Sequence, residues 1–175
     1  MKRLIQKAKE ESGANKIKNF LDQIAAYHYE DQMPLVPEIL NMTDNAYTYN
    51  GPAYRVIRLP SNENINSMND EDLNSWIIQN IKIDNNYASW SKTETGVMSF
   101  IDNNWELGRK EFITVIISFN VSNALDLFKL AEDYYNERFY IGEYIRNDSD
   151  IFKTTQEILA PMTSDYQVYK ILSKN

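Results

Sequence analysis

The chain has 175 residues, a formal charge of −7 and no cysteine. This length corresponds to about one domain, large enough to enclose its own hydrophobic core. The lack of cysteine excludes disulfides, thiolate nucleophiles and cysteine-based zinc sites, and the single histidine, His28, excludes a histidine-rich metal site. We therefore expect a single domain, residues 1–175, without a metal cofactor.

The charge is unevenly distributed along the chain. Residues 1–20 contain six basic and two acidic residues, a balance of +4, which leaves −11 for the remainder. An acidic body repels phosphate backbones, so we expect no general affinity for nucleic acid. No apolar run of about 18 residues occurs, and the charges throughout MKRLIQKAKEES are unlike a secretion signal. The sequence predicts a cytoplasmic protein that does not associate with a membrane.

The N-terminal part is predicted to be helical and then irregular. Residues 2–12 favour a helix that Gly13 weakens. A second, amphipathic helix follows, and we expect its apolar stripe to pack on the flank of the main body. The stripe consists of Ile17, Phe20, Leu21 and Ile24. Residues 31–50 are predicted to be an irregular approach segment that ends in a turn at Asn50-Gly51.

The first predicted strand covers residues 53–59 and ends at Pro60. Alternation places Arg55 on the same face as Leu59, which we take as the core side. A buried arginine is costly unless an anion meets it. Periodicity leaves the opposite assignment, with Arg58 inward, open.

The rest of the chain is predicted to contain strands with helices inserted between some of them. Helices are predicted at 70–80, 94–102 and 124–135, and strands at 111–121, 157–161 and 166–172. The helix 70–80 has a cap at Asn69 or Asp70. Strand 111–121 is rich in β-branched residues and apolar on both faces, as a central strand would be. Residues 145–156 are polar and predicted to be a loop. Helices followed by strands with inserted helices indicate an α+β fold.

Three separated motifs carry candidate chemistry. They are the strand residues Tyr54-Arg55, the Ser89-Trp90-Ser91 motif that leads into a helix, and Glu157 at the start of EILAPMTSDYQV. In this order they resemble the arginine–serine–glutamate class of ADP-ribosyltransferases, and the layout is most similar to small bacteriophage-encoded mono-ADP-ribosyltransferases. The resemblance covers roughly residues 50–172, most of the chain.

The resemblance implies a fold and an activity. The fold would be an ADP-ribosyltransferase-like split mixed β-sandwich with flanking helices, comprising an accessory helical segment (1–49) and a core (50–175). NAD⁺ would lie in the cleft between the two sheets as co-substrate. The protein would transfer ADP-ribose to a host macromolecule, with protein favoured over nucleic acid, and release nicotinamide. A phage-encoded member would act in the host cytoplasm during host takeover.

The resemblance also assigns roles to individual residues. Glu157 would stabilise the positive charge that develops on the ribose when the nicotinamide bond breaks. Arg55 would bind the phosphates of NAD⁺ through its guanidinium fork. Ser89 would hydrogen-bond the glutamate and position the ribose. The remaining residues assigned to NAD⁺ binding are Tyr54, Trp90 and Ser91, with Tyr87 beside them.

Two positions depart from the family pattern and leave alternatives open. Val56 stands where glycine is frequent, and Thr155 occupies the acceptor-side position at which arginine-modifying members carry glutamate. Threonine has no negatively charged group that could bind an arginine substrate. The molecule that receives ADP-ribose therefore remains open among other side chains, a nucleic-acid base, a small molecule or water. A catalytically silent protein on the same fold that binds and inhibits a host protein is the main alternative. A carboxylate-pair hydrolase that uses Glu157 with Glu143 or Asp165 is a third.

Overall fold

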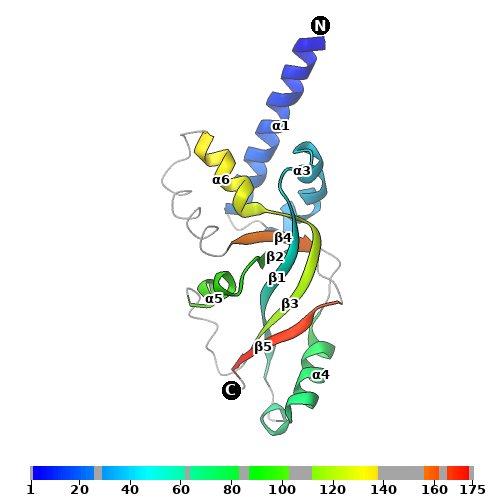
Figure 1. Ribbon diagram of the computed structural model, residues 1–175, viewed down its shortest axis with the longest axis vertical. Coiled ribbons are helices and arrows are strands. Elements are labelled where there is room, and N and C mark those ends of the chain that lie inside the picture. Colours follow the sequence, from blue (N-terminus) through cyan, green and yellow to red (C-terminus); the bar gives the residue numbers. More distant parts are fainter. Residues whose placement is uncertain are drawn as a thin grey trace.

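The computed structural model describes residues 2–25, 29–61, 64–82, 87–102, 112–137, 156–161 and 165–173. Two long strands, β1 (Thr48–Pro60) and β3 (Phe112–Leu125), pair antiparallel and run along the long axis of the molecule (Figure 1). Strand β5 (Gln167–Ser173) pairs with the other side of β3. The predicted central strand is confirmed, because β3 pairs with β1 on one side and with β5 on the other.

The two short strands form a separate ribbon across the long ones. Strand β2 (Tyr87–Ser91) pairs along its whole length with β4 (Glu157–Pro161). In the described residues this ribbon joins the long strands through one residue pair at each side, Tyr54 with Ser91 and Leu125 with Leu159. Figure 1 shows β4 lying across β1 and β3.

The predicted α+β class is confirmed in its general form, a five-stranded sheet with helices around it. The expectation that the sheet is mixed is wrong for the part of the chain described here, since every pairing there is antiparallel. The finer expectation, an ADP-ribosyltransferase-like split sandwich, stays a prediction.

One hydrophobic core lies on the inner face of the long strands. Ala53 and Leu59 of β1 point into it, and Arg55 shares their face by alternation, as predicted. Arg58 is exposed on the other side. Helix α4 (Asp70–Asn80) and the short η2 turn (Ile65–Ser67) pack against this core. Buried members contributed by β3 and by α4 are Ile113, Val115, Ile117, Leu73 and Ile77.

Helix α4 occupies the predicted residues for local reasons. The Asn69 side chain accepts a hydrogen bond from the Asp72 N–H at 2.9 Å and caps the first turn. Three acidic residues in that turn also complement the positive end of the helix dipole. Tyr166, just before β5, donates a hydrogen bond to the Ile78 carbonyl at 3.1 Å and ties α4 to the sheet.

A second core joins the N-terminal helices to the ribbon. Helix α1 (Lys2–Ala25) passes through Gly13 without a break, so the prediction of two helices is wrong. A Cβ at Gly13 would lie 3.2 Å from Met42 Cε, which shows that α1 and α3 (Val36–Met42) approach closely there. The predicted apolar stripe is confirmed as core-forming. Its members Phe20, Leu21 and Ile24 are buried, and Ile17 packs beside them.

Residues 29–47 are more regular than predicted. They form α2 (Tyr29–Gln32), η1 (Met33–Leu35) and α3, followed by a turn. Pro34 and Pro37 do not prevent this, because each occupies the first turn of its helix, where the missing N–H has no helical partner. The turn predicted at Asn50-Gly51 is wrong: those residues belong to β1, at a register shift. The chain turns earlier, at Asp44 and Asn45, which have positive φ.

The remaining helices flank the ribbon. Helix α5 (Glu94–Asp102) has the predicted bounds. Helix α6 (Leu127–Glu137) begins three residues later than predicted, because β3 continues to Leu125. Of the predicted loop 145–156, residues 145–155 lie outside the described residues. Strand β1 begins at Thr48, so the proposed 49/50 boundary falls within a strand. In the described part of the chain, no helix is sufficiently long and apolar to cross a membrane.

Alanine substitutions at Gly51 and Gly13 are expected to change stability in opposite directions. At Gly51, φ is 154° and a Cβ would lie 2.8 Å from the Tyr49 hydroxyl oxygen. We expect Gly51→Ala to lower the free energy of unfolding by about 1–3 kcal/mol through backbone strain and this clash. Gly13→Ala is the matched control. It should raise the unfolding free energy by up to about 1 kcal/mol, because alanine favours the helix and Met42 Cε can move. Urea denaturation checks both, and equal effects would contradict the expectation.

Candidate active site

Three of the residues singled out from the sequence meet at the ribbon. The Ser89 hydroxyl donates a hydrogen bond to Glu157 Oε1 at 2.5 Å. Arg55 Nη1 donates to the main-chain carbonyl of Ser89. These residues are 34 and 68 positions apart, so tertiary structure alone brings them together. The result is a connected series from guanidinium through Ser89 to carboxylate.

Strand register explains the serine–glutamate contact. Ser91 lies directly opposite Glu157, and Ser89 lies opposite Leu159. Ser89 is therefore a diagonal neighbour of Glu157 on the same face, within reach of a side-chain hydrogen bond. Glu157 is only 5% exposed. A buried carboxyl group needs a hydrogen-bond partner, and the Ser89 hydroxyl supplies one.

The backbone at the start of β4 is unusual. Gln156 has φ of 51°, in the left-handed region that residues other than glycine rarely adopt. Its carbonyl accepts a hydrogen bond from the Lys92 N–H at 3.0 Å. Such conformations persist where surrounding structure enforces them, and they are frequent at functional sites. Here the conformation sets the direction in which the chain enters β4, and so the placement of Glu157.

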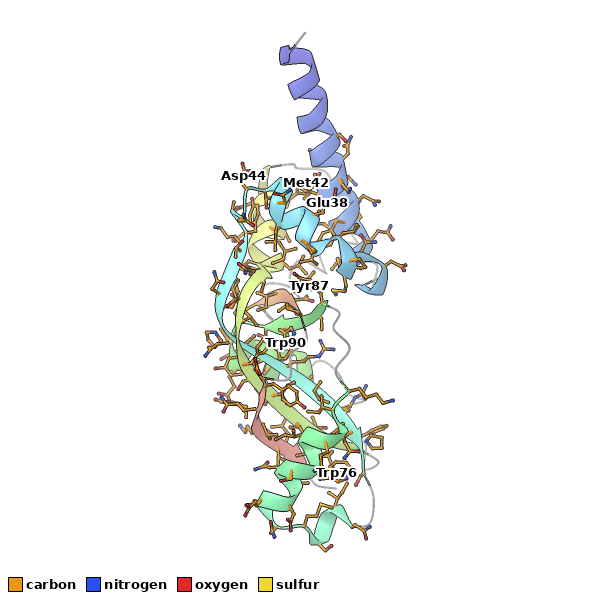
Figure 2. The ribbon with its side chains drawn as sticks, turned by 90° about the vertical axis from the view of Figure 1, so that its right-hand side faces the viewer. Glu38, Met42, Asp44, Trp76, Tyr87 and Trp90 are labelled. Carbon is orange, nitrogen blue, oxygen red and sulfur yellow. The ribbon has the colours of Figure 1, made fainter. Side chains whose placement is uncertain are left out.

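Trp90 and Ser91 support the site from within. Trp90 alternates with Ser89 on β2 and points to the other face of the ribbon, where it is 2% exposed and packs edge-to-face with Phe119 at 4.6 Å. Figure 2 shows it in the middle of the molecule. Ser91 Oγ donates to the Thr93 carbonyl at 2.8 Å and accepts from the Thr93 N–H at 3.2 Å. Thr93 Oγ1 in turn accepts from the Gly96 N–H and caps α5.

Tyr54 lies on the face of β1 opposite to Arg55. Its ring packs edge-to-face with that of Tyr169, with centroids 5.1 Å apart. The Tyr169 hydroxyl donates to Glu94 Oε2 at 2.8 Å, and this hydrogen bond raises the pKa of Tyr169. Tyr54 thus belongs to a contact between β1, β5 and α5. Thr155, predicted on the acceptor side, and Glu143 lie outside the described residues.

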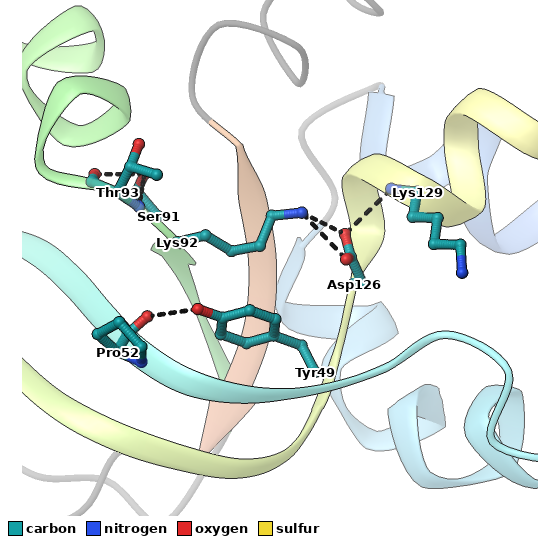
Figure 3. Close-up of polar contacts among 7 residues, drawn as sticks. All are labelled: Tyr49, Pro52, Ser91, Lys92, Thr93, Asp126 and Lys129. Carbon is teal, nitrogen blue, oxygen red and sulfur yellow. Dashed lines mark hydrogen bonds and ion pairs between the residues drawn. The ribbon is translucent and has the colours of Figure 1, made fainter.

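Sequence reasoning missed an ion pair beside the site. Lys92 Nζ lies 3.0 Å from both carboxylate oxygens of Asp126 (Figure 3), and the two side chains are 15% and 13% exposed. Asp126 Oδ1 also accepts from the Lys129 N–H at 3.0 Å. A lysine after a Ser-x-Ser motif carries no local signal of burial. An aspartate before an amphipathic run does indicate a helix cap, and that signal could have located Asp126.

Two aromatic rings lie near the ammonium group of Lys92. Its Nζ lies 5.0 Å from the centroid of the Phe128 ring and 5.8 Å from that of Tyr49. The Tyr49 hydroxyl donates to the Pro52 carbonyl at 2.9 Å (Figure 3). Burial raises the pKa of Tyr49, and the negative charge of Asp126 raises it further. Cation–π contacts of this kind strengthen when the cation is withdrawn from water.

The raised pKa of Tyr49 predicts a pH dependence of stability. Below the ordinary tyrosine pKa of 10.0 the contribution of Tyr49 is fully present. As the pH rises through 10.0 toward the higher pKa of the folded protein, the unfolded chain loses this proton first, so the free energy of unfolding decreases. Tyr49→Phe cannot lose a proton. Urea denaturation between about pH 9 and 11 should show a shallower decrease for this variant than for wild type. Parallel curves would contradict the assignment.

Within the described residues, no group of three or more His, Cys, Asp or Glu side chains is placed to hold a metal ion. No protein-family model matches the chain, and comparisons with curated proteins and with solved structures also find no match.

Proposed function

We propose that the protein is a mono-ADP-ribosyltransferase, which cleaves the nicotinamide–ribose bond of NAD⁺ and transfers ADP-ribose to a macromolecule. The observation that carries this proposal is the hydrogen bond from Ser89 to the buried Glu157, with Arg55 bound to the same serine through its carbonyl. The motif resemblance requires these three residues to act together, and they are in contact. A fold does not need an arginine, a serine and a buried glutamate in series.

The chemistry of the reaction explains the use of Glu157. When the bond between ribose C1′ and the nicotinamide nitrogen breaks, the electron pair leaves with nicotinamide and positive charge develops on the ribose. A fixed carboxylate stabilises that charge without reorganising at the moment of reaction. The acceptor nucleophile then forms the new bond to C1′ and releases its proton to solvent water. Ser89 keeps the Glu157 carboxylate in one orientation.

Arg55 supplies positive charge on the other side of Ser89. A guanidinium carries five N–H donors in a planar fork, which suits a diphosphate. One donor is used on the Ser89 carbonyl, so Arg55 also fixes the strand that carries the serine. In the proposed complex the guanidinium binds the NAD⁺ phosphates.

The acceptor is proposed to be a host macromolecule, with protein favoured over nucleic acid. The balance of −11 outside residues 1–20 repels a phosphate backbone and supports this preference. No metal ion takes part in the proposed reaction.

The role of Glu157 is tested with Glu157→Gln. Glutamine keeps the shape and an oxygen that can accept from Ser89, but it lacks the charge. We expect nicotinamide release to fall by about 10²–10³-fold, with the fold and NAD⁺ affinity retained, because one preorganised charge is removed. Glu38→Gln, at an exposed glutamate on α3 paired with Lys16, is the matched control and should behave as wild type.

The assay incubates each protein with labelled NAD⁺ in a bacterial lysate and examines protein and nucleic-acid fractions separately. Label that depends on Glu157 supports the transferase, and the labelled fraction identifies the acceptor class. Turnover by Glu157→Gln at the wild-type rate would refute the assignment of the glutamate. A wild-type protein that neither transfers label nor releases nicotinamide would instead be the catalytically silent binding protein.

Arg55→Ala tests phosphate binding. We expect its affinity for NAD⁺, measured by calorimetry, to fall by about 10²-fold, since hydrogen bonds to charged groups are each worth about 1.5–3 kcal/mol. Arg55→Lys keeps the charge but loses the fork, and its affinity should be intermediate. Wild-type affinity in Arg55→Ala would remove the phosphate role.

A further inference from the structure

The ion pair between Lys92 and Asp126, which is largely withdrawn from water, joins two strand ends that both hold β4. Lys92 directly follows β2, and Asp126 directly follows β3. Lys92 Nζ contacts both Asp126 oxygens at 3.0 Å and lies 5.8 Å and 5.0 Å from the ring centroids of Tyr49 and Phe128. Because the two side chains are 15% and 13% exposed, this pair is less screened than surface pairs, and its geometry is restricted.

The main chain at Lys92 holds the residue before Glu157. The Lys92 N–H donates to the Gln156 carbonyl at 3.0 Å, which continues the β2–β4 ladder one step past the pair Ser91–Glu157. Gln156 is the residue with φ of 51°. The left-handed conformation next to Glu157 is therefore fixed by a hydrogen bond from the residue that also forms the ion pair.

The main chain just before Asp126 holds β4 on the other side of Glu157. Leu125 pairs with Leu159, two residues beyond Glu157. Asp126 itself is fixed by its N–H, which donates to the Tyr47 carbonyl at 2.7 Å, and by Oδ1, which caps α6 through the Lys129 N–H. Strand β4 is thus held on both sides of Glu157, at Gln156 and at Leu159, by segments that the ion pair connects.

We propose that Lys92 and Asp126 are positioning residues for Glu157. Their ion pair fixes the separation of the two points that hold β4, and so keeps the carboxylate under the Ser89 hydroxyl. The consequence for catalysis rests on the proposed transferase function, whereas the consequence for the geometry of Glu157 does not. Neither residue touches substrate in this proposal.

Asp126→Asn is the sharpest variant. Asparagine caps helices as well as aspartate does, so α6 should be retained while the ion pair loses its negative charge. We expect kcat for nicotinamide release to fall by about tenfold with KM within about twofold of wild type, because a slightly misplaced catalytic group affects the chemical step more than binding. Lys92→Arg keeps the charge and should retain most of the wild-type kcat.

Lys129→Met is the matched control. It removes a neighbouring lysine charge, which lies over the Tyr47 ring, but keeps the main-chain N–H that Asp126 accepts. We expect wild-type kcat and KM for this variant. If Asp126→Asn does not fold, Lys92→Met replaces it, because methionine removes the ammonium group and leaves the N–H to Gln156 in place.

A second readout is independent of turnover. Glutamate labelled with ¹³C at the carboxyl reports the environment of Glu157 by NMR, with its resonance assigned by its loss in Glu157→Gln. We expect this resonance to move in Asp126→Asn and to stay unchanged in Lys129→Met. A purely structural ion pair would lower the stability to urea without moving it.

The two readouts separate the possible failures. Reduced kcat, unchanged KM and a moved resonance support the proposal. A folded Asp126→Asn protein with wild-type kcat and an unmoved resonance overturns it. If wild type releases no nicotinamide, the transferase function fails, and the resonance alone decides: movement in Asp126→Asn supports positioning, and no movement overturns it.

Discussion

The structure depends on how a five-residue strand, β4, is held. In the described residues it has a full partner in β2, but β2 and β4 each join the long strands through a single residue pair. Backbone pairing with the long strands is therefore too sparse to fix the ribbon, and packing on both of its faces must supply the rest. Trp90, Ile158 and Ala160 fill the core under the long strands, whereas Leu159 enters the core formed with the N-terminal helices.

This arrangement gives the N-terminal helices a direct connection to the site. Phe20, Leu21 and Ile24 of α1 share a core with Leu125 and Leu159, the pair that joins β3 to β4. The accessory segment is thus part of the packing that supports Glu157, even though its residues contribute none of the candidate catalytic groups. Loss of this packing would expose apolar surface and loosen the ribbon together.

The polar groups of the site oppose stability and are compensated locally. A buried carboxylate, a partly buried arginine and a nearly buried lysine each cost free energy on leaving water. Glu157 accepts a hydrogen bond from Ser89, Arg55 Nη1 donates to the Ser89 carbonyl, and Lys92 pairs with Asp126. Replacing such groups by apolar residues is often neutral or stabilising, so their presence in one region of the ribbon favours a functional explanation over a structural one.

The sequence by itself determined those elements whose signals are local. Asn69 with the acidic turn after it specifies the start of α4, β-branched residues specify β3, and the order of the three motifs located Arg55, Ser89 and Glu157 as candidates. Only the tertiary structure decided that α1 continues through Gly13, where Met42 packs against it. It also decided the helices at 29–42, whose buried Val36 and Ile39 need a partner surface. It also decided the Lys92–Asp126 pair. The physical reason is common to all three: burial and charge pairing arise from residues distant along the chain, and no local pattern records them.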